Sequence, residues 1–169
     1  MVQVPYFDNI EIKLSDDDYD PTNPRAAAAL GAFLTLTSEN RLKDTRHVFA
    51  YYRDFREAVG GEDWMDKEMG VPERPEDIWS FVYPNELGIW SGRNGDASHY
   101  VFLEANCGWE QEHGLLLVWR DGTTLIKAGG FDGHATNANA YADDSLREVV
   151  YRAIDPNYTT RISNDRIAE

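Results

Sequence analysis

The sequence predicts an α+β fold with two N-terminal helices, then an antiparallel β-meander, and one C-terminal helix. Apolar residues recur at helical spacing after Pro24, at strand spacing from Trp79 to Ala128, and at helical spacing again after Asp144. Helices and strands that occur in separate runs are typical of α+β domains. The chain has 169 residues, a length at which one core is stable without a disulfide or a metal. Residues 1–169 are therefore expected to form a single domain.

The two N-terminal helices are predicted from capping residues and apolar periodicity. Asn23 precedes Pro24, and since asparagine caps free backbone amides and proline fits a first turn, a helix is expected from Pro24 to about Leu36. Ser38 is expected to cap a second helix, which Gly60-Gly61 ends. The apolar positions of this second helix are Leu42, Phe49, Tyr52, Phe55 and Val59.

Two further segments flank these helices. Residues 4–14 alternate weakly between apolar and polar side chains, which predicts a half-buried strand. Between Glu62 and Asp77 the acids and two prolines predict an irregular acidic connector, with one short turn around Trp64, Met65 and Met69.

The C-terminal half predicts the meander and the last helix. Strands are expected at Trp79–Tyr83, Leu87–Trp90, Tyr100–Ala105, Leu115–Arg120 and Thr123–Ala128. Asp121-Gly122 predicts a tight hairpin, because both positions of such a turn need positive φ. The last helix is expected to start at Asp144 or Ser145, to carry Leu146, Val149, Val150 and Ile154, and to end at Asp155-Pro156-Asn157. The conformation of residues 158–169 stays open.

Charge and composition exclude several classes of function. Lys and Arg total 16 against 30 Asp and Glu, giving a formal charge of −14, which repels nucleic acid and anionic membranes and attracts basic proteins and metal cations. The acids are densest in Asp16–Asp20 and Glu62–Asp77. No apolar run approaches the ~20 residues of a membrane-spanning helix. Residues 1–8 do not resemble an export signal, and the lone Cys107 has no disulfide partner, so a cytoplasmic protein is expected.

The motifs of several common enzyme classes are absent. The sequence contains no dinucleotide-binding glycine loop, Walker loop, Gly-x-Ser-x-Gly elbow, Cys-x-x-Cys pair or His-Glu-x-x-His helix. The nucleotide-binding, serine-hydrolase and standard zinc interpretations therefore lose their usual support.

Candidate functional residues gather in two loops of the predicted meander. One loop runs from Cys107 to Gly114 and the other contains Asp132-Gly133-His134. Loops on a rigid scaffold often carry binding and catalytic groups. The candidate binding residues are Trp109, Glu110, Glu112, His113, Asp132 and His134.

These loops allow a metal interpretation and a purely structural one. Imidazoles and carboxylates suit a divalent transition metal, and the candidate ligands are His113, His134, Asp132 and Glu112. In the structural interpretation both histidines bind backbone groups to fix turns and the acids face water. Cys107 is not followed by a helix N-terminus that would lower its pKa, so a buried and inert thiol is expected.

The segment from Tyr100 to Tyr141 resembles a bacterial family of small, acidic, cytoplasmic proteins of unknown function. The specific part is Cys-Gly-Trp-Glu-Gln-Glu-His-Gly-Leu at residues 107–115, followed by Asp-Gly-His at residues 132–134. The resemblance covers about a quarter of the chain, and residues 1–77 do not contribute to it. It implies relatives encoded near toxin systems, and hence an immunity or other interaction role. It implies no catalytic residues.

The leading functional hypothesis is a non-enzymatic cytoplasmic protein that binds a basic partner protein, for example an immunity protein that neutralises a basic toxin. The aromatic anchor for such a partner would be Trp64 or Trp109. The alternative is a metal-dependent hydrolase or a metal-binding module, with His113 and His134 as ligands and Glu112 as general base. A third hypothesis is a structural subunit whose acidic surface only keeps it soluble. The oligomeric state stays open.

Overall fold

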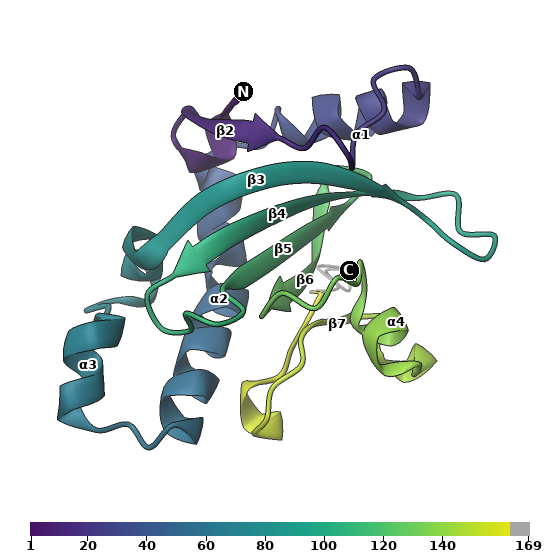
Figure 1. Cartoon of the computed structure of the whole chain (residues 1–169). Helices are drawn as coiled ribbons and strands as arrows, with labels where there is room; N and C mark the ends of the chain where they lie inside the picture. Colours follow the sequence, from purple (N-terminus) through teal and green to yellow (C-terminus); the bar gives the residue numbers. More distant parts are fainter. Residues whose placement is uncertain (163–169) are drawn as a thin grey trace, which may run out of the picture.

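A six-stranded sheet with the strand order β1-β2-β3-β4-β5-β6 forms the middle of the computed structural model, which describes residues 1–162 (Figure 1). Neighbouring strands are antiparallel except β2 and β3, which are parallel. The sheet is mostly antiparallel and the chain mixes helices with strands, which confirms the coarse prediction. The strands are β1 (Val2–Val4), β2 (Ile10–Leu14), β3 (Val82–Ser91), β4 (His99–Cys107), β5 (Leu115–Arg120) and β6 (Thr124–Gly129).

Two helices cover one face of the sheet. Figure 1 shows α2 (Ser38–Ala58) behind the strands, and α1 (Pro24–Phe33) near the end of the sheet where the β5–β6 turn lies. They enclose the main core with the fully buried Trp119 and Leu117 of β5. On the opposite face Phe102 and Val118 form a smaller apolar cluster, against which Phe131 and Ala135 pack. Both faces of the central strands are therefore buried, which explains their continuous apolar runs.

The predicted starts of both helices can be compared with their observed caps. The Asn23 side chain accepts hydrogen bonds from the amides of Arg25 and Ala26, with Pro24 in the first turn, as predicted. The second helix is capped by Thr37 rather than Ser38. The Thr37 hydroxyl accepts the Glu39 amide while the Asn40 side chain accepts the Thr37 amide, which is a capping box.

The predicted hairpin at Asp121-Gly122 is confirmed. Both residues have positive φ, 49° and 71°, and the Thr123 amide donates to the Arg120 carbonyl at 3.1 Å. The tip packs against α1, so a Cβ at Gly122 would overlap the carbonyl oxygen of Ala29. Glycine is therefore required at this position both for its φ and for the close approach of α1.

The first two predicted strands of the meander are one strand. β3 spans Val82–Ser91, and a register shift between Pro84 and Glu86 lies between the two predicted strands. The preceding residues, where the strand Trp79–Tyr83 was expected to begin, form the 3₁₀ helix η2 (Pro75–Phe81). This helix directs the Trp79 indole N–H to the Thr45 hydroxyl of α2 at 2.9 Å.

The acidic connector is more regular than predicted. Residues Asp63–Met69 form the short helix α3, which includes the turn expected there, and the irregular prediction is wrong for them and for the start of η2. A bidentate ion pair joins α3 to α2, since Arg56 Nε and Nη2 lie 2.6 and 2.7 Å from the two oxygens of Asp66. The buried Met69 adds an apolar contact.

The predicted C-terminal helix is wrong. The 3₁₀ helix η3 (Asp144–Leu146) is followed by the strand β7 (Val149–Tyr151), the 3₁₀ helix η4 (Pro156–Tyr158) and the strand β8 (Thr160–Arg161). An unexpected helix, α4 (Asn137–Tyr141), lies before them. Three consecutive residues of β7 are buried, a pattern that fits a strand covered on both sides but not a half-exposed helix. Residues 163–169 of the open tail lie outside the described part of the chain.

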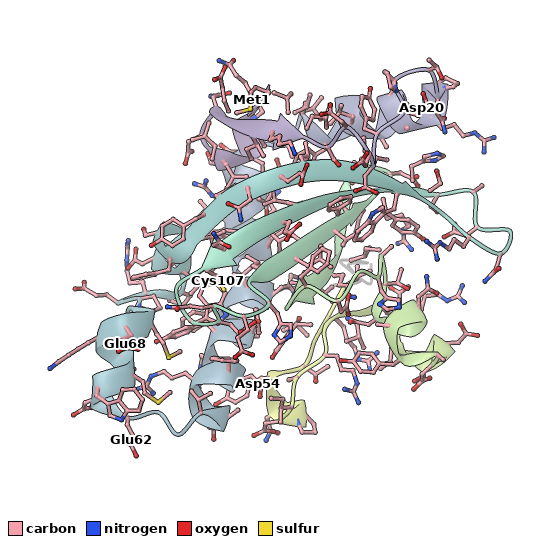
Figure 2. All side chains as sticks on the ribbon, viewed as in Figure 1. Met1, Asp20, Asp54, Glu62, Glu68 and Cys107 are labelled. Atoms are coloured by element: carbon pink, nitrogen blue, oxygen red, sulfur yellow. The ribbon has the colours of Figure 1, made fainter. Side chains whose placement is uncertain are left out.

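The C-terminal segment (residues 136–162) is attached to α2 by buried polar groups. Figure 2 labels one of them, Asp54. Asp54, which is 2% exposed, accepts hydrogen bonds from the Tyr151 hydroxyl at 2.6 Å and from the Ile154 and Asp155 amides at 2.7 and 3.0 Å. His47 Nδ1 lies 2.7 Å from the Thr160 hydroxyl. Burial and the neighbouring Arg46 lower the pKa of His47 to about 3, so the imidazole is neutral at physiological pH.

A third polar group of α2, Asp44, faces the N-terminal segment. Its carboxylate accepts a hydrogen bond from the Tyr6 hydroxyl at 2.9 Å. Burial raises the pKa of Asp44 from 3.8 to about 6, and the Tyr6 hydrogen bond opposes that shift. Because the folded-state pKa exceeds the unfolded value, the unfolded chain binds fewer protons in this window. The free energy of unfolding therefore falls as the pH rises from about 4 to about 6.

Asp44→Asn is expected to stabilise the protein above that window, because asparagine removes the buried charge and retains an oxygen acceptor for Tyr6. We expect the free energy of unfolding to rise by about 2 kcal/mol at a pH of about 7.5 and not to rise at a pH of about 4. Urea denaturation at both values measures the difference. A gain of equal size at the two pH values would contradict the assigned cause.

Candidate functional site

The loop between β4 and β5 is organised by one buried carboxylate. Glu110 is 6% exposed. Its Oε1 accepts the Glu112 amide and its Oε2 accepts the His113 amide, both at 2.8 Å, while the Tyr51 hydroxyl of α2 lies 3.5 Å from Oε2. The loop ends at Gly114, whose φ is 61°. The local sequence thus folds around its own glutamate, since a buried carboxylate needs donors for its oxygens.

This fold of the loop brings three potential metal ligands together. One ligand atom from each of Glu110, Glu112 and His113 lies within 4.8 Å of the others. His113 Nδ1 lies 3.3 Å from Glu110 Oε2. The side chains of Glu112 and His113 are exposed. The group can accept a cation from solvent, with Glu110 as its fixed inner member.

The second loop is organised by a buried lysine. Lys127 Nζ donates to both oxygens of Asp132 at 2.6 Å and to the His134 carbonyl at 3.0 Å. Burial lowers the pKa of Lys127, and the Asp132 carboxylate opposes that shift. His134 Nδ1 lies 2.7 Å from the Asp132 carbonyl oxygen, and the His134 amide donates to the Asp132 side chain at 3.0 Å. These contacts fit the turn-fixing interpretation of this histidine.

The two loops face each other across a cleft of about 620 Å³. Of the six predicted residues, Glu110, Glu112, His113 and Asp132 line it, whereas Trp109 and His134 do not. The residues that sequence reasoning missed are mainly aromatic. Tyr51 and Phe55 come from α2 and Tyr141 from α4, whereas Phe131 directly precedes Asp132 in the second loop. The lining is Tyr51, Phe55, Glu110, Gln111, Glu112, His113, Gly130, Phe131, Asp132 and Tyr141.

Trp109 belongs to the core rather than to the surface. Its side chain is 2% exposed and packs edge-on against the rings of Tyr51 and Tyr52, with centroid distances of 5.6 and 6.0 Å. It therefore offers no surface to a partner in this conformation. Trp64 is the exposed alternative, with 58% of its surface accessible.

Cys107 is buried, as expected. Its Sγ donates to the Glu110 carbonyl at 3.3 Å, and burial raises the pKa of the thiol to about 12. A thiol with such a pKa is not a thiolate at neutral pH, so it is neither a nucleophile nor a strong metal ligand.

Comparison with known proteins identifies the family but not an activity. A family model described as a domain of unknown function, DUF6985, matches residues 1–135. The chain belongs to this family. No curated protein and no solved structure matches the chain. The DUF6985 match includes both loops and also residues 1–77, which had not contributed to the sequence resemblance. It ends before α4, so Tyr141 of the cleft lies outside the matched residues. Among residues 1–162 no helix is both long and apolar enough to span a membrane.

Glu110→Gln is expected to loosen the first loop, because an amide cannot accept hydrogen bonds at both terminal atoms. Amide hydrogen exchange at Glu112 and His113 should accelerate at least about tenfold, with a loss of about 1–3 kcal/mol in the free energy of unfolding. Glu112→Gln is the matched control, since within residues 1–162 the Glu112 side chain makes no hydrogen bond. Equal exchange rates in both variants would contradict the role of Glu110.

Proposed function

We propose that the protein is a non-enzymatic binding protein for a basic partner protein. The observation that carries the proposal is an acidic arm (residues 62–77) with an exposed tryptophan. The arm contains seven acids against Lys67 and Arg74. Figure 2 labels Glu68 on α3 and Glu62 directly before its start, away from the sheet. A rim of carboxylates around an exposed aromatic residue fits a basic surface that carries an apolar pocket.

The charges of the arm are only partly neutralised within the protein. Asp66 pairs with Arg56 and Asp77 pairs with Arg74 at 2.7 Å. The exposed acids that remain are Asp63, Glu68, Glu73, Glu76 and Glu62, the last of which accepts the Trp64 indole N–H at 2.7 Å. These acids contribute to the overall charge of −14 and concentrate part of it in the arm. Complementary charge of this kind mainly accelerates encounter with a cationic partner.

An immunity protein that neutralises a basic toxin in the bacterial cytoplasm is the specific form of this function that we propose. It is supported by the charge, by the absence of common catalytic motifs from the sequence, and by the resemblance of the two loops to small acidic proteins near toxin systems. Binding by surface complementarity requires no catalytic group, which agrees with the inert Cys107.

Neutralising four unpaired acids of the arm, Asp63, Glu68, Glu73 and Glu76, by amide substitution is expected to slow association with a basic partner recovered by affinity pull-down. The association rate constant at low salt should fall about tenfold and lose much of its salt dependence. Trp64→Ala should instead accelerate dissociation. Stopped-flow or surface plasmon resonance measures both rates.

The charge-matched control neutralises four exposed acids outside the arm: Glu11, Glu39, Asp144 and Glu148. This variant changes the net charge by the same amount and is expected to retain most of the wild-type rate. An association rate constant that does not change with ionic strength would contradict the proposal. Equal slowing in the two variants would limit the role of the acids to net charge alone.

Binding of a divalent metal is the second candidate function, and the group of Glu110, Glu112 and His113 favours it. Its nitrogen and oxygen donors suit zinc or manganese. This group replaces the predicted ligand set, because Asp132 is engaged by Lys127 and His134 is turned to its own loop. Glu112, the expected general base, becomes a ligand in this arrangement. The hydrolase hypothesis therefore has no general base, and only metal binding is proposed.

If the group binds zinc or manganese, saturating metal should raise the melting temperature of the wild-type protein and of His134→Ala, but not of His113→Ala. At a metal concentration about 100 times the Kd, the native state gains about 2.7 kcal/mol. Thermal unfolding with and without metal measures the shift. The same shift in His113→Ala would reduce the effect to nonspecific binding by surface acids.

A further inference from the structure

We infer that the cleft between the two loops receives one arginine side chain of the basic partner. The inference rests on the proposed function and names the group that the partner inserts. Three features of the lining, all of it within the described residues, support the inference: its carboxylates, its aromatic rings, and the absence of lysine and arginine, which would repel a guanidinium group.

The charge of the lining is complementary to a cation. Glu110, Glu112 and Asp132 contribute carboxylates, and the lining residues, all within the described part of the chain, include no lysine or arginine. Asp132 is neutralised by Lys127, so Glu110 and Glu112 are the effective anionic groups. The volume of about 620 Å³ exceeds what one side chain fills and lies within the usual range of ligand sites.

The inner carboxylate is already ordered before a partner arrives. Two backbone amides hold Glu110 in one orientation, and the Tyr51 hydroxyl lies 3.5 Å from its Oε2. Glu112 is exposed beside it, and within residues 1–162 its side chain makes no hydrogen bond. A guanidinium group can therefore meet one fixed and one solvent-exposed carboxylate. A fixed acceptor lowers the entropy cost of binding.

Aromatic rings favour arginine over lysine. Tyr51, Phe55, Phe131 and Tyr141 line the cleft, and a planar guanidinium both stacks on such rings and forms paired hydrogen bonds with carboxylates. The protein itself contains one such contact, because the Arg152 guanidinium lies 4.0 Å from the centroid of the Tyr141 ring. Arg152 is not a lining residue, so this contact does not place a cation within the cleft.

The test uses N-acetyl-L-arginine amide as the probe, with the lysine and norleucine amides as comparisons. In ¹⁵N and aromatic ¹³C NMR titrations we expect saturable shifts in the millimolar range at Gln111, His113, Gly130 and the rings of Phe131 and Tyr141. The lysine analogue should bind more weakly, and the norleucine analogue should not bind. Equal affinities for arginine and lysine, or shifts confined to residues 62–77, would overturn the inference.

A matched pair of double variants tests the assigned residues. Glu112→Gln with Tyr141→Leu removes one exposed carboxylate and one ring from the cleft, and should weaken arginine amide binding about tenfold. Glu11→Gln with Tyr83→Leu makes the same chemical changes elsewhere, since Tyr83 is 54% exposed and Tyr141 49%, and should leave the affinity unchanged. Equal weakening by both pairs would show binding to general surface charge and would overturn the inference.

The outcomes separate this inference from the proposed function. If the basic partner associates with salt-dependent kinetics but arginine amide does not bind the cleft, the cleft inference fails and the proposed function stands. If the protein associates with no basic partner, the proposed function fails instead. The His113→Ala variant distinguishes arginine binding in the cleft from metal binding. It removes a metal ligand and leaves the carboxylates and rings that bind arginine.

Discussion

The structure depends on the satisfaction of polar groups that α2 carries into the interior. A buried polar side chain without a partner costs more than a buried apolar one, so each such group fixes the segment that supplies its partner. The N-terminal segment, η2, the first loop of the cleft and the C-terminal segment are all held in this way. The pairs are Asp44 with Tyr6, Thr45 with Trp79, His47 with Thr160, Tyr51 with Gly114, and Asp54 with Tyr151.

The same pairs show why the sequence predicted α2 but not its buried face. The apolar spacing predicted the helix, yet Leu42 is 52% exposed and Val59 38% exposed, while Asp54 and His47 are almost fully buried. The partner of Asp54 lies 97 residues away. Periodicity reports local amphipathicity and carries no information about such distant partners. The C-terminal segment was misassigned for the same reason, since its strand β7 is stabilised by contacts with α2 and β8 and not by its own spacing.

For the candidate site, too, the sequence carried information about local neighbours but not about distant ones. Glu110, Glu112 and His113 lie together because one short loop carries them, and the chemistry of the Asp121-Gly122 hairpin is equally local. Three of the four aromatic rings were not predicted because they come from α2 and α4, whereas Phe131 was missed although it lies beside Asp132. Lys127 left a signal that was missed: one lysine in an otherwise apolar strand, between Ile126 and Ala128, requires a buried anion nearby. Asp132 supplies it, and is therefore less free for a ligand than its loop position suggested.

The cleft joins the matched family domain to residues that lie beyond it. Tyr51 of α2 contacts Glu110 on one side, and on the other it packs against Tyr151 with a centroid distance of 5.3 Å. Tyr151 is in turn held by Asp54. Two aromatic rings in contact thus separate Glu110, which orders the first loop, from Asp54, which holds the C-terminal segment. Because closely packed rings leave little room for independent movement, the C-terminal segment that contributes Tyr141 also helps to hold the ring that contacts Glu110. The geometry of the cleft is therefore a property of residues 1–135 and the C-terminal segment together.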